Sequence, residues 1–396
     1  MITEKDALDA LPSHGFVRAY CQYAAVQTTA PLAYHIGVAM SMLAVTCPLG
    51  YGTRYAINQR PNLFVMLAGR SGDDQKSTAI EIGREILFEA CPTLIGDQPG
   101  SSEGMIESLS KQPTQLLIYK EMGKLLASTQ RGYLEPLKAL LTDLSDCSSQ
   151  QRVKAKQKGE NNVIRVDSPR LSIIGACSLP FLEKHTEAVD WTGGFLGRWA
   201  LLYAQRERTN CWPAGTTHGR AALVQSLASR SLTPTAGWMN KPTGHVGKIW
   251  KDWFEDVDHR KLPDLVAGAR TRAPIVALKA ALLYGWDLGH SHSGEPWEMD
   301  TSVLDPAIKF AELYLTSIVN LSGKLAEHPD ARVRRNVLGC FGHGEALKLG
   351  QVLKRTKLRK RTVSEILDSL TVEGTIKRLN LPNGESVYIQ QAGPAS

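Results

Sequence analysis

The order of apolar and polar residues along the chain predicts alternating strands and helices between residues 58 and 208. Apolar runs of strand length occur at 62–68, 115–119 and 171–176, and helical segments separate them, beginning with an amphipathic helix over about 76–89. Short apolar runs bounded by helices are typical of buried parallel strands. We therefore expect an α/β fold for this part of the chain.

The flanking segments have different patterns. Residues 1–57 predict a helical N-terminal region that closes on an uncharged helix at about 32–45. Residues 209–330 begin with a connection rich in Pro, Gly, Thr and Ser and continue as helices, which we interpret as a linker and a helical lid. The uncharged stretch 19–53 is too polar for a membrane span, so it predicts buried helices instead.

The segment 331–396 predicts a winged helix-turn-helix domain. Its apolar residues repeat at helical spacing over 363–370, directly after a capping box that runs from Thr362 to Glu365. A short helix at about 349–353 precedes this helix, and two strand-like segments around an Asn-Gly turn follow it. Helices and a hairpin in this order are the elements of a winged helix.

The net charge of the chain is concentrated in this last segment. The 396 residues carry 46 basic and 39 acidic side chains, a formal charge of +7, and residues 331–396 alone hold 12 basic and 5 acidic ones. A basic module attached to a neutral body indicates nucleic-acid binding. The candidate DNA contacts lie where the two predicted helices join, at Lys354, Arg355, Lys357, Arg359, Lys360 and Arg361.

The seven cysteines are scattered, odd in number and never spaced as C-x-x-C. This usage argues for reduced thiols in the cytoplasm and against a disulfide scaffold or a zinc site. The N-terminus has no apolar segment of the signal-peptide kind. We therefore expect a cytoplasmic protein that does not insert into a membrane.

A strand, a glycine-containing turn and Lys76-Ser77-Thr78 at a helix start predict a phosphate-binding loop, or P-loop. Backbone amides and Lys76 would bind phosphate oxygens, and Ser77 would bind Mg²⁺, so the implied cofactors are ATP and Mg²⁺. The candidate nucleotide-binding residues are Gly69, Gly72, Gln75, Lys76, Ser77 and Thr78. Gln75 stands where the usual pattern has glycine, and Gly69 lies one residue further from the lysine than usual. The alternative is a structural turn with a surface lysine.

The second predicted strand ends in Lys120-Glu121, at a place where P-loop ATPases have two acids that hold magnesium and activate water. Lys120 replaces the first acid. Glu121 remains the candidate general base. The alternative is a buried strand that ends in two solvated charges.

The third predicted strand is followed by Ser178, a candidate γ-phosphate sensor. Arg198 follows a Gly-Gly-Phe-Leu-Gly turn and is a candidate arginine finger, although such an arginine is often structural. Arg270 and Arg272 are weaker candidates for a second sensor.

Four basic residues alternate with other residues between the second and third strands. Arg152, Lys154, Lys156 and Lys158 would share one face of a strand that turns at Lys-Gly-Glu-Asn. Such a hairpin could track a nucleic-acid backbone in the pore of a ring, or it could be a solvated surface.

The motif order resembles P-loop ATPases of phages, plasmids and genomic islands that form the helicase part of primase-helicases. It is also similar to the wider AAA+ helicases that include the minichromosome-maintenance proteins. The matching stretches are 61–67, 76–79, 101–105, 121–126 and 193–198, together with the C-terminal winged helix. The resemblance implies that Lys76 and Ser77 bind nucleotide and magnesium, Glu121 activates water and Ser178 senses phosphate. It further implies a homo-oligomer, with a hexameric ring as one form, in which Arg198 acts from an adjacent subunit.

These features predict an ATP-dependent DNA helicase or DNA-remodelling ATPase that acts on single-stranded or forked DNA in phage or mobile-element replication. The alternative is a DNA-binding replication initiator or regulator with a degenerate, non-hydrolysing nucleotide site. Lys120 favours the alternative, whereas Lys76, Ser77, Glu121 and Arg198 favour the enzyme. A third possibility is an ATPase that acts on a protein partner, as a loader or defence protein.

Overall fold

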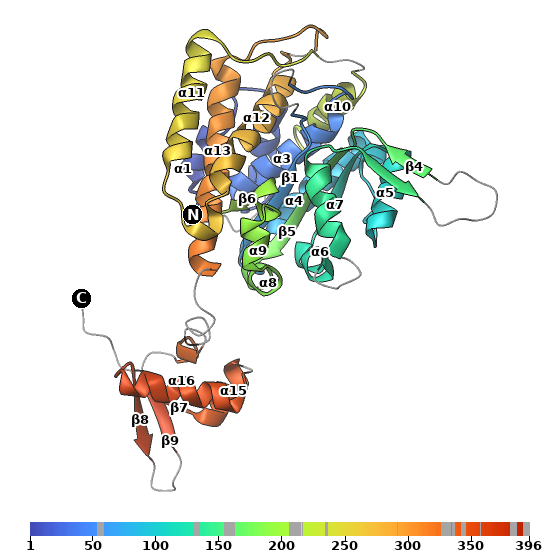
Figure 1. Cartoon of the computed structure of the whole chain (residues 1–396). Coiled ribbons are helices and arrows are strands. Elements are labelled where there is room, and N and C mark those ends of the chain that lie inside the picture. The colour runs from blue at the N-terminus through green and yellow to red at the C-terminus, as the bar shows by residue number, and fades with distance from the viewer. Residues whose placement is uncertain are drawn as a thin grey trace, which may run out of the picture. The chain divides into compact units, whose positions relative to one another are not determined.

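The described part of the chain divides into two units. The computed structural model describes residues 1–53, 59–129, 135–153, 163–205, 215, 217–233, 237–290, 292–325, 334, 337–341, 346–356, 358–380 and 386–390. The first unit is Met1–Ser322 and the second is Gly323–Ser396 (Figure 1).

The first unit is built on a four-stranded parallel sheet. Its strands are β1 (Phe64–Gly69), β2 (Thr114–Tyr119), β5 (Arg170–Ser178) and β6 (Trp199–Tyr203), in the order β2-β5-β1-β6. The α/β prediction is confirmed, because the three predicted apolar runs form β1, β2 and β5. The sequence pattern did not separate β6 from the turn before it.

Helices cover both faces of this sheet. Val65 and Leu67 of β1 lie against Gly37 of α3 (Leu32–Thr46), a helix that is buried along its whole length. Gly175, which pairs with Met66, lies against Met122 of α6 (Met122–Thr129) on the opposite face. Residues paired in a parallel register share a face, so α3 and α6 enclose the sheet from two sides.

The remaining elements of the first unit pack around this core (Figure 1). The helices are α1 (Glu4–Asp9), α2 (Phe16–Gln27), α4 (Lys76–Ala90), α5 (Ser102–Lys111), α7 (Glu135–Ser145), α8 (Leu179–His185), α9 (Ala188–Thr192), α10 (Arg220–Ser231), α11 (Gly244–His259), α12 (Ala269–Asp287) and α13 (Thr301–Leu325). Strands β3 (Gln150–Val153) and β4 (Val163–Val166) form an antiparallel pair. Helix α10 lies in the segment predicted to be a plain connection. Its apolar pattern is weak because only Leu223 and Leu227 are buried.

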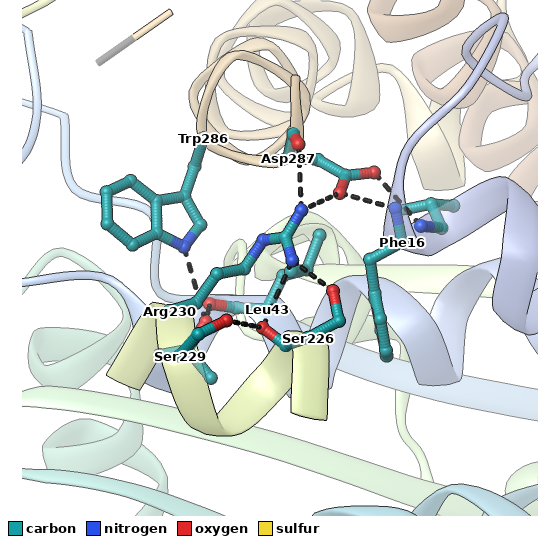
Figure 2. Close-up of polar contacts among 9 residues, drawn as sticks. Phe16, Leu43, Ser226, Ser229, Arg230, Trp286 and Asp287 are labelled. Carbon is teal, nitrogen blue, oxygen red and sulfur yellow. Dashed lines mark hydrogen bonds and ion pairs between the residues drawn. The ribbon is translucent and has the colours of Figure 1, made fainter. Parts of the chain in front are cut away.

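A buried carboxylate joins three helices of the first unit, as Figure 2 shows. Asp287, at the end of α12, accepts hydrogen bonds from the backbone N–H groups of Phe16 (2.6 Å) and Val17 (2.9 Å), which open α2. Arg230 of α10 lies 3.0 Å from the same carboxylate. Gly15 precedes α2 with φ +99°, and a Cβ there would lie 2.5 Å from an Asp287 oxygen. Only glycine therefore allows the carboxylate to reach the start of α2.

A buried lysine joins α12 to the segment before β1 and to the end of α7. Lys279 donates to the backbone carbonyl oxygen (3.0 Å) and side-chain oxygen (2.9 Å) of Asn62 and to the Ser145 carbonyl oxygen (2.7 Å). Burial lowers the pKa of its ammonium. Three acceptors compensate for the loss of water around this charge.

Within the ranges described for it, the second unit combines the helices α15 (Leu349–Thr356) and α16 (Lys360–Val372) with a small antiparallel sheet. The strands of this sheet are β7 (Ala346–Lys348), β8 (Ile376–Asn380) and β9 (Ser386–Gln390), in the order β7-β9-β8. Val352, Val363, Leu367 and Tyr388 belong to its core. This arrangement contains the predicted helices and hairpin strands, while the Asn-Gly turn lies outside the described residues.

The predicted capping box is wrong. Helix α16 begins two residues before Thr362, with Arg359 as its N-cap and no side-chain cap hydrogen bond. Glu365 pairs instead with Arg361 one turn earlier, at 2.8 Å. The basic residues before Thr362 therefore extend the helix, and Glu365 lies too far along it to reach the first backbone N–H groups.

None of the described helices is long and apolar enough to cross a membrane. The six cysteines within the described ranges are free thiols, and Cys211 lies outside those ranges.

We expect Asp287→Ala to lower the free energy of unfolding by about 3 kcal/mol, because it leaves Arg230 and the start of α2 without their buried acceptor. Urea denaturation measures this loss. Asp256→Ala is the matched control, since that carboxylate pairs with Arg260 at the surface, and its cost should stay below about 0.5 kcal/mol. Equal costs for the two variants would contradict the role assigned to Asp287.

Candidate functional site

A six-residue loop between β1 and α4 forms the floor of the candidate site. Gly72 has φ +82° and Gln75 has φ +48°, so the loop turns twice through left-handed backbone before α4 begins at Lys76. The Lys76 ammonium donates to the Arg70 carbonyl oxygen at 2.5 Å, across the loop. Lys76 is 7% exposed, and burial lowers its pKa. The lysine is thus held inside the loop between β1 and α4.

Gly69 lies in a narrow space at the end of β1. A Cβ at this position would lie 2.5 Å from a carboxylate oxygen of Asp74 and 2.6 Å from the Tyr34 hydroxyl. Asp74 is buried and accepts the Arg70 N–H at 2.5 Å, and Tyr34 lies 2.7 Å from the Ala68 carbonyl oxygen. Neither Asp74 nor Tyr34 was predicted as part of the site, although the acid belongs to the loop itself.

The unusual residue Gln75 is anchored by the N-terminal region. Its side-chain oxygen accepts hydrogen bonds from the Thr29 N–H (3.1 Å) and the Thr28 hydroxyl. A residue with a Cβ is disfavoured at φ +48° by about 1 kcal/mol, which these contacts can offset. Thr28 and Thr29, which follow α2, therefore hold Gln75 in a left-handed backbone conformation that usually requires glycine.

The order of the strands gathers the other predicted residues at the same edge of the sheet. Ser178 pairs with Gly69 in the register of β5 and β1, and Tyr119 pairs with Gly175 in that of β2 and β5. The Ser77 hydroxyl donates to the Lys120 carbonyl oxygen at 3.3 Å. All three carboxyl strand ends therefore lie beside the start of α4.

A cavity of about 550 Å³ opens between these elements. Its lining residues are Ser71, Gly72, Gln75, Lys76, Ser77, Thr78, Lys120, Glu121, Gly123, Ala176, Ser178 and Phe181. The lining includes seven predicted nucleotide-site residues, and Gly69 lies at the adjacent strand end. A second cavity, of about 790 Å³, shares Lys120 and Glu121 with the first.

Lys120, which departs from the P-loop ATPase pattern, forms an ion pair with α4. Its ammonium lies 2.6 Å from Glu81, whose other oxygen accepts from Arg84 at 2.5 Å. The hydrogen bond from Arg84, assisted by Lys120, lowers the pKa of Glu81 to about 2. Glu81 was not predicted as part of the site, because it lies 39 positions from its lysine partner in the sequence.

The expected magnesium ion does not fit the protein groups around Ser77. At triphosphate sites Mg²⁺ is held by one or two carboxylates together with the phosphates, but the one carboxylate among the described lining residues, Glu121, has the cationic Lys120 beside it. The loop itself has two acids: Asp73 is exposed and does not line the cavity, and Asp74 is 1% exposed. Within the described ranges no group of three or more His, Cys, Asp or Glu side chains could hold a metal ion.

Arg198 lies at the opposite edge of the sheet from the cavity. It directly precedes Trp199, which pairs with Phe64 at the amino end of β1, about 17 Å from the carboxyl end. The guanidinium lies 3.2 Å from Asp146 and 3.0 Å from the Gly194 carbonyl oxygen. Burial and the charge of Arg198 lower the pKa of the nearby Arg272. Arg198 therefore cannot reach the cavity of its own chain.

Arg270, the other weaker sensor candidate, donates to the carbonyl oxygens of Ala267 and Asp258. Those contacts tie it to the segment before α12, and it does not line the cavity.

The candidate DNA contacts are described only in part. Arg152 lies on β3, which pairs with β4 as a hairpin requires, but its side chain and Lys154, Lys156 and Lys158 lie outside the described residues. In the second unit, Lys354, Arg355, Arg359, Lys360 and Arg361 are exposed, and Lys357 is not described. Arg355 donates to the Cys340 carbonyl oxygen at 2.6 Å.

No protein family model matches this chain, and no curated protein sequence matches it. The residues around the cavity are therefore the basis for a functional assignment.

Two glycine substitutions in the loop should differ in their effect. Gly69→Ala should lower the free energy of unfolding by about 3 kcal/mol, because its Cβ collides with buried Asp74 and Tyr34. Gly72→Ala adds a Cβ with nothing within 4 Å, so only the cost of its positive φ, about 1 kcal/mol, should remain. Chemical denaturation of both variants measures the difference. If Gly72→Ala lowered the free energy of unfolding more than Gly69→Ala does, the close contacts around Gly69 would not be what constrains the loop.

Proposed function

We propose that this protein binds a nucleoside triphosphate in a P-loop and acts on DNA, as an ATP-dependent DNA helicase or DNA-remodelling ATPase of a phage or mobile element. The observation that carries the proposal is the cavity at the carboxyl edge of the sheet. It brings together Lys76 and Ser77 of the loop with Glu121 and Ser178 from two other strand ends. These residues come from three separate parts of the sequence.

Each group has a distinct task in this proposal. Phosphate oxygens would replace the Arg70 carbonyl as the partner of Lys76, and backbone N–H groups at the start of α4 would bind them. Glu121 would orient the attacking water, and the Ser178 hydroxyl would donate to the terminal phosphate. Arg198, at the far edge, would enter the cavity of a neighbouring copy in a homo-oligomer.

The second unit supports the assignment to DNA as a winged helix. The described residues among its predicted DNA contacts lie at the end of α15 and at the start of α16, where Arg359, Lys360 and Arg361 are exposed. Further along α16 the exposed residues include Glu365 and Asp368. Phosphate contacts should therefore be confined to the N-terminal end of this helix.

A second candidate is a DNA-binding initiator or regulator that binds the nucleotide without hydrolysing it. The ion pair between Lys120 and Glu81 favours this function, because it puts a cation where P-loop ATPases have a carboxylate.

We expect ATP hydrolysis that single-stranded or forked DNA stimulates. Lys76→Ala should weaken ATP binding about tenfold or more, since it removes a charge-assisted contact to phosphate, and should abolish hydrolysis. Phosphate release and binding of a fluorescent ATP analogue measure the two effects. Lys111→Ala, at an exposed lysine on α5, is the matched control.

Thermal unfolding of Lys76→Ala separates loss of the site from loss of the fold. ATP binding without hydrolysis under all DNA conditions would support the regulator instead of the helicase. Equal ATP binding by wild type and a folded Lys76→Ala variant would contradict the nucleotide site itself.

The double variant Arg359→Gln with Lys360→Gln should bind DNA more weakly and with a shallower salt dependence. Each lost phosphate contact should reduce the slope of log K against log salt concentration by about 0.9, so the expected change is about 2. Fluorescence anisotropy between low and moderate salt measures this slope. The pair Lys111→Gln with Lys251→Gln, on exposed faces of the first unit, is the control. An unchanged slope in the first double variant would place the DNA contact elsewhere.

A further inference from the structure

The net charge of the residues that line the cavity is two units more positive than it would be in a P-loop ATPase with an acidic pair. Among the described lining residues the charged side chains are Lys76, Lys120 and Glu121, which sum to +1. With an acid at position 120 the sum would be −1, and a bound divalent cation would bring it back to +1. Lys120 therefore supplies the same net charge that a metal would.

Glu81 fixes the Lys120 ammonium beside the start of α4 without cancelling its charge. Glu81 lies four residues after Ser77 on the same helix, so both face β2. Its single negative charge is shared between Lys120 at 2.6 Å and Arg84 at 2.5 Å. The three groups together keep a charge of +1 next to the cavity.

Lys120 is able to turn toward a ligand in the cavity. Its side chain is 54% exposed. A lysine has a flexible four-carbon stem that ends in an ammonium with three N–H donors. The Lys120 carbonyl oxygen already lies 3.3 Å from the Ser77 hydroxyl, so the residue lies where the triphosphate and its counter-ion would be bound. A polyanion with several phosphate oxygens would compete with Glu81 for this ammonium.

We propose that Lys120 takes the place of the divalent cation in the binding step, so that this site binds nucleoside triphosphates without magnesium. The inference rests on the proposed nucleotide site. It concerns binding alone, and hydrolysis is a separate step.

Titration of a fluorescent ATP analogue, with either excess magnesium or EDTA, tests this inference on the full-length protein. For the wild type the two dissociation constants should differ by less than about threefold, which is less than one charge-assisted hydrogen bond contributes. Lys120→Asp restores the acid of the usual pattern, and its binding should weaken about tenfold or more when EDTA replaces magnesium. Lys251→Asp, at another exposed lysine paired with a glutamate, should behave as the wild type does.

The possible results separate this inference from the proposed function. Wild-type binding that falls about tenfold or more in EDTA would overturn the inference and leave the nucleotide site intact. Equal magnesium dependence of wild type and a folded Lys120→Asp variant would also overturn it. An absence of nucleotide binding under both conditions would overturn the proposed function and this inference together. Thermal unfolding of each variant shows whether it is folded.

Discussion

The carboxylate of Asp287 is the interaction on which the position of the candidate site depends. It accepts the first two N–H groups of α2 and pairs with Arg230, so it fixes where α2 begins relative to α10 and α12. Helix α2 is 12 residues long, about 18 Å, and Thr28 follows its last residue. The Thr28 hydroxyl and the Thr29 N–H donate hydrogen bonds to Gln75 in the loop between β1 and α4. A buried ion pair is thus connected to the loop through one rigid helix.

The polar groups at the two edges of the parallel sheet have different surroundings. At the amino edge, Lys279 and Asn62 satisfy each other and nearby carbonyl groups in a closed, buried network. At the carboxyl edge, polar groups such as Ser77 and Lys120 remain exposed around a cavity. In parallel sheets the carboxyl ends are where loops can form a crevice for a ligand. The hydrogen-bonded network stabilises the amino edge, and the proposed ligand would bind at the carboxyl edge.

Sequence patterns predicted the parts of the fold and site that are continuous along the chain. The apolar runs gave β1, β2 and β5, and the residues from Gly72 to Thr78 come together because they are neighbours in sequence. The threonine partners of Gln75, the Glu81 partner of Lys120 and the Asp146 partner of Arg198 could not be predicted, since each lies about 40 to 50 positions away and only the folding of the chain brings them close. The start of α16 was misplaced because a local capping signal at Thr362 was overridden by helix formation before it.

The low pKa of Glu81 has a consequence for how the site responds to acid. Its hydrogen bond with Arg84 and its pair with Lys120 lower the pKa from the ordinary 4.5 to about 2. A depressed carboxyl pKa stabilises the folded state above the unfolded value, and that contribution is lost only as the pH falls from 4.5 toward 2. Proton uptake at Glu81 is therefore negligible near neutrality. Glu81 thus keeps its negative charge, and its ion pair with Lys120, across the pH range in which histidine side chains ordinarily titrate.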